Sequence, residues 1–77
     1  MTEQRKTRPI EPGVTYHERS VGRLITTAHV LAVAPDPLGI PHVHFLLEMK
    51  LPSGTRCREE KRVLSVDRFS DLYQAAM

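Results

Sequence analysis

The sequence has no tryptophan, and its four aromatic side chains are Tyr16, Phe45, Phe69 and Tyr73. A core needs several of them, so we do not expect the aromatic-lined groove with which many small modules bind proline-rich peptides. The sequence also has a single cysteine, Cys57, which excludes an intrachain disulfide and favours a reducing compartment.

Long apolar runs are missing as well. The first residues, MTEQRKTRPIEPG, lack the apolar core of about 7 to 15 residues that marks a secretory signal. The longest mainly apolar stretch, residues 28–34, contains a histidine and is too short to span a bilayer. We therefore expect a cytoplasmic protein that makes no membrane contact.

The chain is short, and its excess charge lies at one end. Its 77 residues allow one domain, and such a small fold has little room for a deep catalytic pocket, so we do not expect an enzyme. Residues 1–8 hold three basic side chains against Glu3, which accounts for the whole net charge of +2. Since the remainder is neutral, nucleic-acid binding through this arm and an arginine-bearing strand is only a second alternative function.

Turn-forming residues and alternation divide the chain. Residues 1–13 contain Pro9, Pro12 and Gly13 and predict a disordered N-terminal arm, whereas residues 14–77 predict a single domain. Alternating apolar and polar residues predict four strands, at residues 14–20, 22–33, 42–51 and 55–64. The second of these strands is long and apolar on both faces, so we expect a bend or a bulge in it.

The sequence also predicts the loops and turns between these strands. Proline and glycine predict a loop at residues 34–41 and a hairpin turn at residues 52–55. In the third strand, alternation predicts an apolar inner row made of Val43, Phe45, Leu47, Met49 and Leu51.

The spacing of apolar residues changes after the fourth strand, from every second residue to every third or fourth. Val66, Phe69, Leu72 and Tyr73 fall at helical spacing, and Ser65 is placed to cap the N-terminus of a short C-terminal helix. Sequential strands joined by tight turns favour antiparallel pairing. The expected fold is therefore mainly β, a small antiparallel and partly open barrel with one short helix.

Three segments carry a resemblance to known proteins: TYHERSVGRLITTAHVL, PHVHFLLEM and EEKRVLSVDRFSDLY. Over roughly residues 14–73 the chain resembles small uncharacterised bacterial proteins with SH3-like barrels. The resemblance implies an SH3-like fold and a non-catalytic binding or adaptor module. We expect its partner to be another protein. It implies no catalytic residues.

The stretch PHVHF, residues 41–45, is the most chemical part of the sequence. Positions i, i+2 and i+6 of a strand share one face, which places His42, His44 and Glu48 together. Imidazole and carboxylate groups suit a divalent transition metal, and this spacing is similar to the first metal motif of cupins. A cupin-like metal-binding protein is therefore one alternative, although no histidine follows His44 to form the second cupin motif.

A solvated strand face explains the same residues more simply, because Glu48 can pair across the ladder with an arginine of the next strand. We therefore favour a site without metal or cofactor, on the outer face of residues 42–50 and the arginines that follow. The residues of this candidate protein-binding site are His42, His44, Glu48, Arg56 and Arg58.

Two further features leave alternatives open. The mixed-charge run REEKR, residues 58–62, is typical of an exposed strand edge, and its arginines with Arg56 are an alternative patch for an acidic ligand. Apolar groups on both faces of residues 22–33, and Leu46 in the polar row of the third strand, fit either the expected bend or a homodimer.

Overall fold

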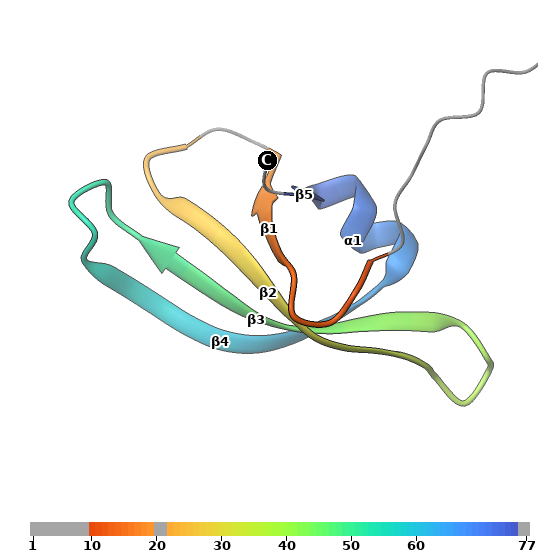
Figure 1. The fold of residues 1–77 in the computed structure, drawn as a ribbon. Coiled ribbons are helices and arrows are strands. Elements are labelled where there is room, and N and C mark those ends of the chain that lie inside the picture. Colours follow the sequence, from red (N-terminus) through yellow and green to blue (C-terminus); the bar gives the residue numbers. More distant parts are fainter. Residues whose placement is uncertain (1–9, 20–21, 76–77) are drawn as a thin grey trace, which may run out of the picture.

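The computed structural model describes residues 10–19 and 22–75. These residues form one unclosed antiparallel sheet of five strands and one short helix (Figure 1), which confirms the expected mainly β, partly open architecture. The strands lie in the order β4-β3-β2-β1-β5. The elements are β1 (Thr15–Glu18), β2 (Ile25–Pro35), β3 (Pro41–Lys50), β4 (Arg56–Ser65), α1 (Val66–Leu72) and β5 (Tyr73–Ala75).

The long strand β2 contains the expected bulge. Its pairing with β3 shifts register between Val30 and Ala32, so that Leu31 is the extra residue. Before the bulge Ala28 and Val30 are buried, and after it Val33 continues the row that packs on the core. One extra residue therefore keeps apolar side chains on the inner face along a strand that curves.

The predicted inner row of β3 is correct for most of its length. Val43, Phe45 and Leu47 are buried, and Met49 packs against the core from a half-buried position. The prediction is wrong for Leu51, which lies beyond the end of the strand and is 40% exposed. The hairpin turn begins at this residue, and its N–H donates to Thr55 O at 2.8 Å.

The turn between β2 and β3 is shorter than the predicted loop of residues 34–41. The strands extend to Pro35 and Pro41, which lie opposite each other at the ends of the ladder. Proline is tolerated at a strand end, and here the side chain of Asp36 closes the turn by accepting from the N–H groups of Leu38 and Ile40 at 2.8 and 2.9 Å.

The helix begins as predicted and ends earlier than its apolar spacing suggests. Ser65 Oγ accepts from the N–H of Arg68 at 3.2 Å, which confirms the N-cap. The helix ends at Leu72, and Tyr73, predicted to be helical, is the first residue of β5, which pairs with β1. The strand β5 was not predicted.

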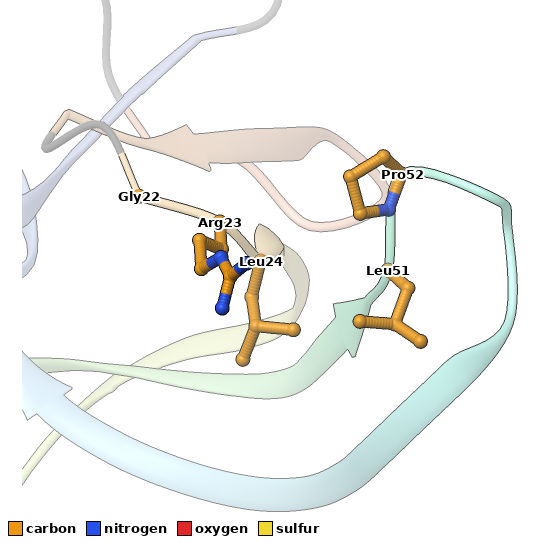
Figure 2. Close-up of a pocket in the computed structure, with 5 residues that line it drawn as sticks. All are labelled: Gly22, Arg23, Leu24, Leu51 and Pro52. Atoms are coloured by element: carbon orange, nitrogen blue, oxygen red, sulfur yellow. The ribbon is translucent and has the colours of Figure 1, made fainter.

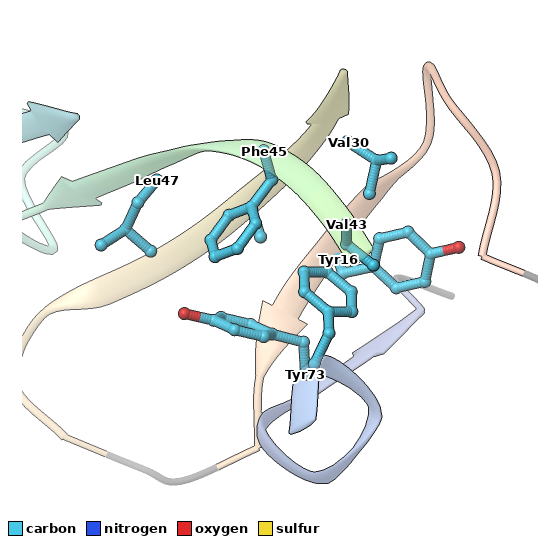
Figure 3. Packing of buried hydrophobic residues seen from close by; sticks show 8 residues of the cluster. Tyr16, Val30, Val43, Phe45, Leu47 and Tyr73 are labelled. Carbon is cyan, nitrogen blue, oxygen red and sulfur yellow. The ribbon is translucent and has the colours of Figure 1, made fainter. Parts of the chain in front are cut away.

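Phe69 of α1 fixes the helix on the inner face of the sheet. Its ring lies 5.1 Å from that of Phe45, 5.3 Å from that of Tyr16 and 4.8 Å from that of Tyr73. The contacts with Phe45 and Tyr16 are edge-to-face and that with Tyr73 is stacked, and aromatic pairs of both kinds add to the stability gained from burial. Around them lies the core seen in Figure 3, made of Tyr16, Ala28, Val30, Val43, Phe45, Leu47, Phe69 and Tyr73.

Residues 1–9 of the predicted N-terminal arm lie outside the described residues. Its last four residues contact the sheet, where Ile10 packs against the core and the N–H of Gly13 donates to Val30 O at 2.9 Å. In the described part of the chain, no helix is long and apolar enough to cross a membrane.

Candidate functional site on the outer face

One face of the sheet is covered by α1, and we call the opposite face of β1 to β4 the outer face. Alternate residues of a strand point to opposite faces, and residues paired across the ladder share a face. The buried residues therefore identify the inner face, and the register assigns the other residues to the outer face. The outer face consists of Thr15, His17, Ile25, Thr27, His29, Ala32, Ala34, His42, His44, Leu46, Glu48, Lys50, Arg56, Glu59, Lys61, Val63 and Ser65. All four histidines of the chain therefore lie on this face.

The structure brings four of the five predicted site residues to the outer face. His42, His44 and Glu48 share it because β3 is regular along this stretch, and Arg56 lies there opposite Lys50. Arg58 does not share it. A register shift at the end of the β3–β4 ladder places Arg58 opposite Met49, on the inner face.

This register shift also divides the alternative arginine patch. Arg58 and Arg62 both contact the carboxylate of Glu60 on the inner face, whereas Arg56 contacts Glu48 on the outer face. The extra residue of β4 at the shift is Cys57, whose thiol is exposed. The strand β4 forms the edge of the sheet, as its mixed charges predicted.

Glu48 is the centre of the outer face. Its side chain is only 11% exposed, and its carboxylate lies 3.0 Å from Nε of Arg56, 3.7 Å from Nζ of Lys50 and 3.5 Å from Nε2 of His29. Desolvation alone would raise the pKa of Glu48. The hydrogen bond from His29 and the charges of Lys50 and Arg56 outweigh it and hold the pKa below its ordinary value of 4.5.

A second group of side chains on this face was missed by sequence reasoning. Thr15 Oγ1 lies 2.9 Å from Nδ1 of His29, whose Nε2 faces Glu48. The ionised carboxylate can only accept, so Nε2 carries the proton and Nδ1 accepts from Thr15. Alternation assigns Thr15 and His29 each to one face of its strand, but only the register between β1 and β2 shows that the two residues are opposite.

The order hydroxyl, imidazole and carboxylate is that of a nucleophile relay. However, His29 lies on β2, between two neighbouring strands whose ladders use the backbone N–H groups that acyl transfer would need as an oxyanion hole. We therefore assign Thr15, His29 and Glu48 a structural role, in which they connect β1, β2 and β3.

His42 is held at the other end of the face. Its Nδ1 lies 2.9 Å from Ile40 O and 3.7 Å from Oδ2 of Asp36. A carbonyl oxygen only accepts, so Nδ1 carries the proton and Nε2 keeps its lone pair. The pKa of Asp36 is lowered from 3.8, chiefly by the hydrogen bond from the N–H of Ile40, with smaller contributions from Leu38 and His42.

The alternative metal site of His42, His44 and Glu48 is not assembled. Among residues 10–19 and 22–75, no three His, Cys, Asp or Glu side chains lie close enough to hold a metal ion together. Glu48 shares a face with His42 and His44 but is held by Arg56, Lys50 and His29 instead.

A pocket lies at the opposite end of the sheet from the β2–β3 turn. It has a volume of about 620 Å³ and is lined by Gly22, Arg23, Leu24, Leu51 and Pro52 (Figure 2). The lining is mainly apolar and includes one cation, and none of the predicted site residues is part of it.

No protein-family model, no curated protein and no solved structure matches this chain. Its function is therefore argued from its own geometry.

Proposed function

We propose that this protein is a non-catalytic binding module of the SH3-like type, which contacts another protein through its outer face. The five-stranded, partly open antiparallel sheet with a short helix before its last strand supports the SH3-like assignment. The single, exposed thiol of Cys57 supports a place in a reducing compartment, the cytoplasm.

The distribution of side chains on the outer face is the observation that carries this proposal. Its apolar centre is small, with Leu46 half-buried and Val63 50% exposed. Ala32 and Ala34 of β2 lie near them, whereas His44 lies opposite Val63, and His29 and Lys61 lie opposite Leu46. Charged side chains of both signs lie toward one end, at Glu48, Lys50, Arg56 and Glu59, and Lys61 lies beside the apolar centre. Apolar side chains flanked by polar and charged groups are typical of a protein interface.

The size of this face indicates which kind of contact it makes. With strands spaced by about 4.8 Å and residues by about 3.4 Å, it measures roughly 15 Å by 30 Å. That is on the order of 450 Å², compared with about 800 Å² on each partner in a stable interface of standard size. The face therefore fits a transient contact.

Photo-cross-linking inside cells tests the proposal. A photoreactive amino acid at position 63 lies in the middle of the outer face, whereas the same group at position 71 lies on the exposed surface of α1. We expect one protein to be cross-linked from position 63 and not from position 71. Equal yields of the same product from both positions would contradict the proposed face.

The cross-linked protein then allows an affinity measurement. Val63→Asp places a charge in the apolar centre and should weaken binding by at least about tenfold, which corresponds to about 1.4 kcal/mol. Asp71→Ala is the matched control on the helix and should leave the affinity unchanged. An unchanged affinity of the Val63→Asp variant would reject the outer face as the contact surface.

A further inference from the structure

We propose that His42 and His44 form a two-histidine binding site for a divalent transition metal ion, of the Cu²⁺, Ni²⁺ or Zn²⁺ class. The site goes beyond the proposed protein contact and does not depend on it. It differs from the three-residue site that was one alternative from the sequence, because Glu48 has no part in it.

The two histidines have the separation that chelation requires. They occupy positions i and i+2 of the regular strand β3, so both project from the outer face, with Cα atoms about 6.8 Å apart. Two nitrogens bound to one ion at about 2.0–2.1 Å lie roughly 3 Å from each other. The two nitrogens therefore need to approach each other by about 4 Å, and since the ring of His42 is held at Ile40 O, rotation about the side-chain torsions of the exposed His44 supplies most of this approach.

The structure prepares His42 for metal binding. A metal-ligating histidine normally donates its second ring N–H to a backbone carbonyl or a carboxylate, which fixes the tautomer and orients the ring. The Nδ1 of His42 has both partners, Ile40 O at 2.9 Å and Asp36 at 3.7 Å. Its Nε2 lone pair is therefore left for a ligand.

The residues directly opposite the pair carry no positive charge. The residues opposite His42 are Ala34 and Ser65, and those opposite His44 are Ala32 and Val63, all of them neutral. Among the outer-face cations, Lys50 and Arg56 are held at Glu48, four residues beyond His44 along β3, and Lys61 lies opposite Leu46, at the position diagonal to His44. Water fills the remaining positions of the ion at this exposed site. The order of affinities for divalent metals then predicts that Cu²⁺ binds more tightly than Ni²⁺ or Zn²⁺.

Calorimetric titration with Ni²⁺ tests the site, in a full-length Cys57→Ser background that removes the exposed thiol as a competing ligand. We expect the background protein to bind one equivalent, and His42→Ala and His44→Ala each to weaken binding by at least about tenfold. His17→Ala is the matched control, since His17 is an exposed histidine of the same face on β1. This control should bind as tightly as the background protein.

Electron paramagnetic resonance of the Cu²⁺-loaded protein identifies the ligands directly. We expect coupling to two imidazole nitrogens, reduced to one in the His44→Ala variant, whose exposed side chain can be removed without disturbing the core. The proposal is overturned by an absence of binding in the background protein, or by equal losses in His17→Ala and His44→Ala. A Cu²⁺ spectrum that the two histidine substitutions leave unchanged overturns it as well.

Discussion

Nε of Arg56 lies 3.0 Å from the carboxylate of Glu48, which is nearly buried although it lies on the face of the sheet that α1 leaves uncovered. The two residues are not directly opposite in the ladder, because Glu48 faces Glu59 and Arg56 faces Lys50. The register shift at Cys57 moves Arg56 to the diagonal position, where it separates the two carboxylates and contacts both. A bulge at the sheet edge thus relieves a repulsion between Glu48 and Glu59.

The first prediction concerns acid stability. The pKa of Glu48 in the folded protein lies below its ordinary value of 4.5, so the folded state binds its proton more weakly than the unfolded state. The stabilisation is present above about pH 4.5 and is lost as the pH falls through the lowered folded-state value. We expect wild-type protein to exceed Glu48→Gln in stability at pH 7, and the difference to shrink below about pH 4.5.

Urea denaturation at a series of pH values measures this difference. Glu59→Gln is the control, because Glu59 is an exposed carboxylate on the same face and contacts only the outer end of the network, at Arg56. Its stability relative to wild type should change less between pH 7 and pH 3. A constant difference between wild type and Glu48→Gln over that range would show that the network does not favour the ionised form.

The second prediction concerns the core. Phe69 is 1% exposed and is the buried residue of α1, and it contacts three other aromatic rings. Phe69→Ala should destabilise by about 3–5 kcal/mol, which approaches the whole stability expected of a domain this small. We expect this variant to be largely unfolded by circular dichroism at 25 °C. Phe69→Leu should remain folded with a lowered melting temperature, and a fully stable alanine variant would mean that α1 contributes little to the fold.

The sequence predicts best what depends on local periodicity. Alternation locates β3 and its buried residues Val43, Phe45 and Leu47, and Ser65 marks the start of the helix. The partly open antiparallel sheet follows from short turns between sequential strands. Each of these features is fixed by residues that are neighbours in the chain.

Features that depend on distant residues could not be predicted. The strand β5 exists because β1 offers a free edge to Tyr73, whose spacing in the sequence is equally helical. The position of Arg58 depends on a bulge at Cys57 that no glycine or proline marks. The contact of Thr15 with His29 needs the register between β1 and β2. The sequence therefore predicted the strands that carry the candidate site and the face of four of its residues, but it placed Arg58 on the wrong face.

The third prediction concerns the end of α1. Arg19 lies 51 residues before Ser70, yet its Nε donates to Ser70 O at 3.1 Å, and its backbone N–H donates to Leu72 O at 2.8 Å. These bonds satisfy carbonyl groups that have no partner within the helix, and the guanidinium is favourable at this end of the helix dipole. Because the site is exposed, Arg19→Met should cost only about 0.5–1 kcal/mol.

Hydrogen exchange locates the effect of the Arg19 substitution. We expect faster exchange at the backbone N–H groups of α1 and β5, and unchanged exchange in the middle of β3. Arg68→Met is the control, since Arg68 lies on the exposed side of the same helix. If both substitutions have the same effect, the contact with Ser70 does not hold the helix end.

The fourth prediction concerns the turn that orients His42. One oxygen of Asp36 accepts from the N–H groups of Leu38 and Ile40, and the carbonyl of Ile40 in turn holds the ring of His42. Asp36→Ala removes the acceptor of both hydrogen bonds and should increase the hydrogen-exchange rates of these two backbone N–H groups by roughly tenfold or more. Asp36→Asn keeps one amide oxygen as an acceptor and should preserve much of the protection.

The same two variants distinguish two effects of Asp36 on Ni²⁺ affinity, namely its hydrogen bonds in the turn and its negative charge. If the turn positions His42, Asp36→Ala should weaken Ni²⁺ binding more than Asp36→Asn does, with a loss of about 10- to 100-fold for removal of an outer partner of a ligand. Gly39, whose φ of 85° favours glycine, provides a variant without any change in charge. Gly39→Ala should disturb the turn and weaken Ni²⁺ binding in the same direction as Asp36→Ala. Equal Ni²⁺ affinities in all three variants would show that the geometry of the turn does not orient the histidine.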